Sequence, residues 1–132
     1  MRFLVDTNIC IYALKQDPIV LERLLEQKPV DVGLSVITEA ELRTGAAKSA
    51  SPTRTARLLE NFLRPLTVVE FVSADAVAYA QLRAKLERAG TPIGPLDTLI
   101  AAQAMARGLT LVSNNEREFR RIGGLRLENW TT

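Results

Sequence analysis

Four acidic residues occupy positions from which carboxylates could share one chemical task. Asp6 directly follows a short apolar run, Glu41 falls inside a predicted helix, Asp97 lies in the first turn of another, and Glu118 belongs to a short helix near the end. The chain contains no histidine and one cysteine. This excludes Ser-His-Asp and Cys-His catalysis and the commonest zinc ligand sets. Any metal must therefore be held by oxygen, which suits Mg²⁺ or Mn²⁺.

Each acid also has a purely structural explanation. Asp6 could cap the helix that follows it. Glu41 stands three residues after Thr38, the spacing of a capping box. Ser35 is already a good cap, however, and this places Glu41 inside the helix, where an inward carboxylate needs a cation or a donor. Asp97 would be favoured by the helix dipole. Only their common position on one edge of a sheet makes these acids a site.

The elements that would position them follow from the apolar pattern, which alternates between strand-like and helical segments. This predicts a single α/β domain over residues 1–132, a three-layer sandwich with a central, mostly parallel sheet of about four or five strands. Such sheets place their sites at the carboxyl ends of the strands. The predicted strands cover residues 2–5, 30–34, 66–72, 109–112 and 125–127, and the predicted helices cover 9–14, a segment from 18, 35–45, 52–65, 74–89, 95–107 and 116–121.

Carboxylates crowded at such an edge repel one another unless a divalent cation neutralises them. Two such cations can activate a water and stabilise the leaving oxygen of a phosphodiester. The formal net charge is +2, and 13 of the 17 basic residues are arginine. If four of the 15 acids belong to a metal site, 11 acids remain against 17 bases, an excess of six. This favours a phosphate-rich partner, although an ordinary solvated surface is the simpler explanation of the charge alone.

The compartment is constrained by what the sequence lacks. No apolar run approaches the roughly 20 residues of a membrane span, and Asp6 interrupts the region where a secretory signal would be apolar. The lone Cys10 cannot form an internal disulfide, which agrees with a reducing compartment. We therefore expect a cytoplasmic protein without a membrane segment.

Taken in order, several segments resemble the PIN-domain ribonucleases, and more closely the VapC toxins of bacterial VapBC toxin–antitoxin pairs. The resemblance covers essentially the whole chain. It rests on residues 4–8 (LVDTN), 38–42 (TEAEL) with Gly45, 92–95 (PIGP) with Asp97 and 100–102 (IAA), Asn114-Asn115 with Glu118-Phe119, and the tail 124–130 (GLRLENW).

The resemblance implies an endoribonuclease that depends on Mg²⁺ or Mn²⁺ and inhibits translation. Asp6, Glu41 and Asp97 match the metal-binding acids of the family. The fourth acid is assigned to Glu118, with Asn115 left open, because many members carry Asp at the latter position. The hydroxyls of Thr7 and Ser113 match positions that support the metal shell.

The resemblance also implies partners. Family members dimerise and are inhibited by a small VapB-like antitoxin whose tail lies in a groove near the acids; we expect that groove around Ile11, Tyr12 and Leu14, with core packing as the alternative. Enteric members that cut initiator tRNA make that RNA a candidate substrate. Arg83 and Arg117 could contact RNA phosphates, but solvated helix faces explain them equally well.

Two other classes of protein are alternatives to this assignment. The first is a catalytically inactive PIN-like module that binds RNA or a partner, and the presence of all three core acids speaks against it. The second is a phospho-accepting receiver domain, which needs a lysine after a late strand. The four lysines are Lys15, Lys28, Lys48 and Lys85, and none is so placed.

Overall fold

The computed structural model describes residues 1–132 and is built on a five-stranded sheet in the order β3-β2-β1-β4-β5, with every neighbouring pair parallel. The strands are β1 (Phe3–Val5), β2 (Val32–Ser35), β3 (Thr67–Val69), β4 (Thr110–Val112) and β5 (Leu127–Glu128). The helices are α1 (Thr7–Leu14), α2 (Pro18–Leu25), α3 (Val36–Ala47), α4 (Pro52–Leu63), α5 (Ser73–Arg88), α6 (Pro95–Ala106) and α7 (Glu116–Phe119), with a 3-10 turn at Pro29–Asp31.

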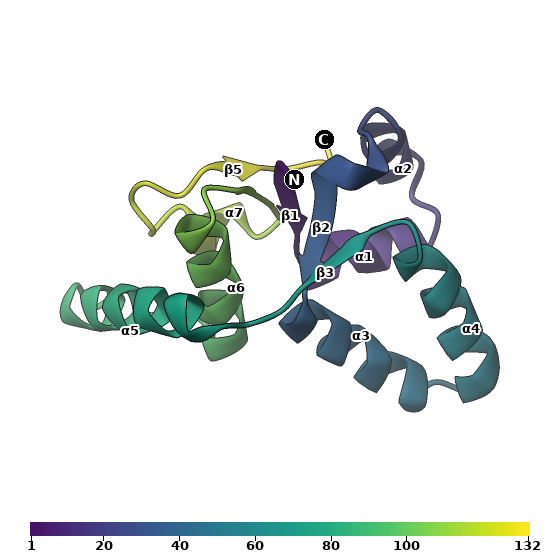
Figure 1. Ribbon diagram of the computed structural model, residues 1–132, viewed down its shortest axis with the longest axis horizontal. Helices are drawn as coiled ribbons and strands as arrows, with labels where there is room; N and C mark the ends of the chain where they lie inside the picture. Colours follow the sequence, from purple (N-terminus) through teal and green to yellow (C-terminus); the bar gives the residue numbers. More distant parts are fainter.

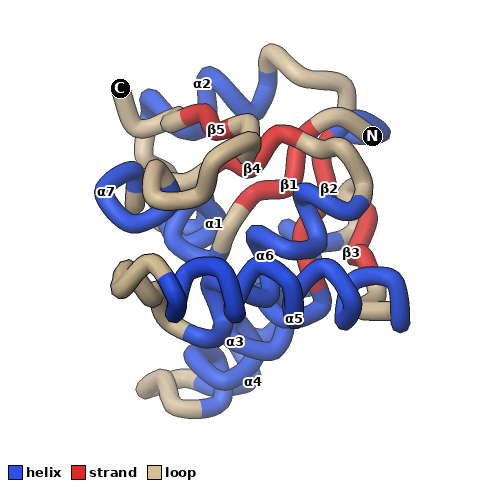
Figure 2. The backbone as a smooth tube through the Cα atoms, turned by 90° about the vertical axis from the view of Figure 1, so that its left-hand side faces the viewer, coloured by secondary structure: helices blue, strands red, loops and turns tan.

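Helices cover both faces of this sheet (Figures 1 and 2). Successive residues of a strand point to opposite faces, and β1 shows the result. Phe3 and Val5 belong to a core shared with α1, α2, α3 and α4, whereas Leu4 belongs to a second core with α5, α6 and α7. The predicted three-layer α/β architecture with a parallel sheet is confirmed.

The starts of the helices explain where the chain turns at the edge of the sheet. The carboxylate of Asp6 accepts a hydrogen bond from the backbone N–H of Ile9, so α1 begins at Thr7, two residues earlier than predicted. The hydroxyl of Ser35 accepts from the N–H of Ile37 and starts α3 as expected. Gly90, at φ +73°, follows the end of α5 in the left-handed conformation that glycine adopts freely.

Three predicted strands differ from the observed ones by two or more residues at one end. The second begins at Val32 because Pro29 opens a 3-10 turn instead. The third ends at Val69, and Val72 already donates its N–H to Asp75 at the start of α5. The fifth covers Leu127–Glu128, not residues 125–127. The end of the third strand is set by pairing, since Val69 is in register with Ser35, the last residue of β2.

Helix α6, which carries Asp97, is fixed to the end of β3 by polar contacts. The buried amide of Gln103 donates to the carbonyl of Glu70 at 3.1 Å. Arg107 donates to the same carbonyl and pairs with the buried Asp75 at 3.0 Å. These contacts hold α5 and α6 against one edge of the sheet. None of the helices combines the length and apolar character needed to cross a membrane.

Candidate active site

Asp6 lies at the carboxyl end of β1, in the middle of the sheet. Its backbone N–H donates to the carbonyl of Val112 at the end of β4, at 3.0 Å. Its side chain is only 3% exposed. The pKa of Asp6 is raised from 3.8 to about 6, chiefly by burial and in smaller part by the charges of Asp97 and Glu41, and hydrogen bonds from Ser113 and the Ile9 N–H oppose this rise. Asp6 is thus both a helix cap and a buried carboxylate whose charge no basic side chain neutralises.

Glu41 reaches this edge from α3, where it is half-buried. The hydroxyl of Thr7 donates to its Oε1 at 2.6 Å, and the same hydroxyl lies 3.2 Å from that of the buried Thr38. The sequence alone explains Thr38 as one half of a capping box. Its position three residues before Glu41 puts both on one helix face, which is the signal that would have assigned it to the site.

Asp97 lies within electrostatic reach of Glu118 and Glu41. Burial raises the pKa of Asp97, and the nearby charges of Glu118 and Glu41 raise it further, whereas a hydrogen bond from Asn115 lowers it. The amide of Asn115 also donates to Glu118 Oε2 at 3.0 Å, and its backbone N–H donates to Ser113 Oγ at 2.9 Å. Both candidates for the fourth position therefore reach the site, Glu118 as a carboxylate and Asn115 as a neutral donor.

The four acids share a property that the ion-paired acids of the protein lack. Asp6, Glu41, Asp97 and Glu118 form no ion pair, which is also true of five other acids, whereas the remaining six acids do. Mutually repelling, partly buried carboxylates without a basic partner are suited to hold a hard divalent cation. No three acids converge into a complete ligand set. Mg²⁺ keeps several waters and binds through one or two carboxylates, so a site for it does not require a complete set of protein ligands.

The two arginines considered for RNA differ in their surroundings. Arg83, on α5, pairs with Glu87 and donates to the hydroxyl of Tyr79. Arg117, on α7 directly before Glu118, is exposed and forms no ion pair. Of the two, only Arg117 has a free guanidinium on the element that carries a site acid.

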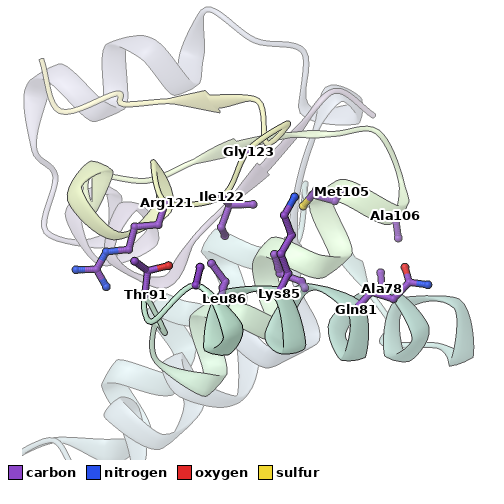
Figure 3. Close-up of a pocket in the computed structure, with 12 residues that line it drawn as sticks. Ala78, Gln81, Lys85, Leu86, Thr91, Met105, Ala106, Arg121, Ile122 and Gly123 are labelled. Atoms are coloured by element: carbon purple, nitrogen blue, oxygen red, sulfur yellow. The ribbon is translucent and has the colours of Figure 1, made fainter.

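A groove of about 380 Å³ runs between α1, α3 and α4 and reaches Glu41. Ile11, Leu14 and Leu58 are among its apolar lining residues. Tyr12, expected in the same groove, does not line it and lies against Asn114 instead. A separate cavity of about 320 Å³ lies between α5, the end of α6 and residues 121–123 (Figure 3), and no carboxylate lines it. The groove, and not this cavity, adjoins the acids.

Comparison with known proteins agrees with the fold. Residues 3–125 match the PIN domain family. The chain is 40% identical over 131 residues to the tRNA(fMet)-specific endonuclease VapC of Shigella flexneri, and this match covers 99% of both chains. It is 41% identical over 130 residues to ribonuclease VapC2 of Haemophilus influenzae strain KW20, covering 98% of both.

Solved structures give the same result. The DNA-bound VapBC complex of Salmonella typhimurium contains a chain with a TM-score of 0.94 at 41% identity, covering 98% of both chains. VapBC2 of Rickettsia felis, bound to a promoter DNA fragment, gives 0.93 at 38% identity, covering 98% of this chain and 99% of that one. The protein belongs to the PIN-domain family and, within it, to the VapC branch.

Proposed function

We propose that the protein is an endoribonuclease that depends on Mg²⁺ or Mn²⁺ and acts in the cytoplasm as the toxin of a toxin–antitoxin pair, inhibiting translation. The observation that carries this proposal is the group of four carboxylates without ion pairs at the carboxyl edge of the sheet. Relatives of the same length named VapC ribonuclease or endonuclease support it.

In this proposal Asp6 and Asp97 hold the cation. The chemistry that such a cation supplies is activation of water and neutralisation of phosphate charge. Asp6 is fixed for this task by the N–H of Ile9. Glu41, oriented by the hydroxyl of Thr7, faces the same edge and can accept a proton from an attacking water. Glu118, held by Asn115, completes the acidic rim.

The substrate proposed for first study is initiator tRNA, because relatives at 40–41% identity are named tRNA(fMet)-specific endonucleases. Arg117 is placed to meet a phosphate at the rim, since it is exposed, unpaired and adjacent to Glu118. A guanidinium can bind phosphate oxygens in a bidentate manner.

The proposed inhibitor is a VapB-like antitoxin in a hetero-oligomer with a homodimer of this chain. Support comes from the VapBC complexes that the chain resembles. The apolar groove that leads to Glu41 suits an apolar antitoxin segment, which would cover the approach to the acids.

The decisive experiment is cleavage of a tRNA(fMet) transcript by the purified protein with Mg²⁺, with Mn²⁺ and with EDTA. We expect cleavage with either cation and none with EDTA. Asp6→Ala should bind the RNA without cutting it. Glu41→Gln should likewise abolish cleavage, whereas Glu39→Gln, on the same helix but paired with Arg43, should cleave normally. Cleavage that persists in EDTA would exclude the metal mechanism, and binding without cleavage by the wild type would favour an inactive module.

A further inference from the structure

Tyr12 is the one exposed aromatic side chain of the protein. Of the seven aromatic residues, four Phe, two Tyr and one Trp, the other six are buried or half-buried. Tyr12 is 37% exposed. Burying aromatic rings is strongly favourable. The exposed third of Tyr12 is therefore available to contact a binding partner.

Tyr12 stands at the rim of the acid cluster. Its hydroxyl accepts a hydrogen bond from the side-chain amide of Asn114, at 3.3 Å. Asn114 lies between Ser113, which contacts Asp6, and Asn115, which contacts Glu118. The ring is thus attached to the loop after β4 that carries the polar contacts of the site.

The surroundings of Tyr12 are polar and distinct from the apolar groove. Ile11, Leu14 and Lys15 line that groove, and Tyr12 does not. Asn8, four residues earlier and on the same side of α1, is exposed. An aromatic ring between two asparagines suits a nucleobase, which stacks on its face and bonds at its edges, better than it suits an apolar peptide.

We propose that Tyr12 is a stacking platform for an unpaired base of the RNA, next to the phosphodiester that is cut. This rests on the proposed ribonuclease function and adds how the substrate is selected. The hydrogen bond from Asn114 orients the ring before RNA binds, which lowers the entropic cost of binding. A base within a duplex cannot offer its face to the ring, so the platform selects unpaired nucleotides.

The first test compares the cleavage of a tRNA(fMet) transcript by Tyr12→Leu, Tyr12→Phe and the wild type. Tyr12→Leu should raise KM about tenfold with little change in kcat, because it removes binding that the ground and transition states share. Tyr12→Phe keeps the stacking face and should stay within about threefold of the wild type. Ile19→Ala, which truncates an exposed apolar side chain on α2, controls for general effects.

The second test observes stacking directly. Single-stranded RNA carrying 2-aminopurine at successive positions is bound to Glu41→Gln protein, with and without Tyr12→Leu. Fluorescence at one position should be quenched only when Tyr12 is present. Equal KM and equal fluorescence for both proteins would overturn the proposal, as would a Tyr12→Leu effect confined to antitoxin affinity. If the wild type cuts no RNA, the ribonuclease function itself fails, whatever the Tyr12 variants do.

Discussion

The hydroxyl of Thr7 donates to Glu41 Oε1 at 2.6 Å, and so the residue after Asp6 orients an acid 34 positions further along the chain. The contact joins α1 to α3 across the edge of the sheet. Two consecutive residues, Asp6 and Thr7, therefore supply one carboxylate of the site and the hydroxyl that positions the carboxylate of Glu41.

Replacing Thr7 by valine keeps its shape and removes this donor. We expect kcat/KM for RNA cleavage to fall about 10–100-fold, the range for lost contacts that orient metal-site carboxylates. Thr7→Ser, which keeps the hydroxyl, should retain most of the activity. Steady-state kinetics together with a melting temperature for each protein distinguish this from unfolding. Equal loss in the serine and valine variants would show that the methyl group, not the hydroxyl, matters.

In the metal-free protein, the contribution of Asp6 to the free energy of unfolding should fall as the pH rises. Burial raises the pKa of Asp6 from 3.8 to about 6 in the folded state. The folded state then binds this proton more tightly than the unfolded state, so the contribution is full below about pH 4 and is lost as the pH rises through 6. At 1.36 kcal/mol per tenfold change in proton affinity, this is on the order of 3 kcal/mol.

Asp6→Asn removes this titration while keeping a side chain that can cap α1. Urea unfolding in EDTA between pH 4 and 7.5 should show the wild type losing stability relative to the variant as the pH rises. Added Mg²⁺ should reverse much of the loss in the wild type alone. A stability difference that does not change with pH would contradict the assignment.

Glu118 and Asn115 should shift the pKa of Asp97 in opposite directions. The charge of Glu118 raises the pKa of Asp97 and the hydrogen bond from Asn115 lowers it. Glu118→Gln should therefore lower this pKa, and Asn115→Ala should raise it, as followed by NMR titration of the Asp97 carboxyl. Mn²⁺ affinity should fall about tenfold in Glu118→Gln and less in Asn115→Ala.

Glu116→Gln is the matched control, since Glu116 lies on the same short helix but pairs with Arg120. It should leave both the pKa of Asp97 and the Mn²⁺ affinity unchanged. If Asn115→Ala weakened Mn²⁺ binding more than Glu118→Gln did, the fourth site residue would have to be reassigned to Asn115.

The apolar groove can be tested through Leu58, which lines it and is 54% exposed. Leu58→Asp places a charge on an apolar docking surface, and we expect at least a tenfold loss of affinity for the proposed VapB-like antitoxin. RNA cleavage without antitoxin should be unchanged. Val77→Asp on α5, outside the groove and similarly exposed, is the control. Equal effects of both substitutions on calorimetric affinity would reject the groove.

Local patterns in the sequence were enough to predict most of the fold and the positions of the acids. The short apolar run Phe3-Leu4-Val5 predicted a strand, and the capping residues Asp6 and Ser35 predicted where helices start. The family resemblance then selected four acids out of 15. The apolar run, the helix caps and the family motifs each depend only on residues that are close together in the sequence, so they can be recognised in a single sequence.

Properties that depend on distant partners were not predictable in the same way. The third strand ends at Val69 because its partner β2 ends at Ser35, with which it is in register. The contact between Thr7 and Thr38 depends on how α1 packs against α3. Likewise, nothing in the segment around Tyr12 indicates that its hydroxyl reaches Asn114, 102 residues away.

The central place of β1 has a consequence for protein synthesis. Its neighbours are β2, made early, and β4, made late, and the N–H of Asp6 bonds to Val112. A nascent chain that has emerged only through α4 contains Asp6 and Glu41 but lacks β4, Asp97 and Glu118. Such a nascent chain therefore cannot assemble the four acids, because they come together only when the last third of the fold pairs with the first strand.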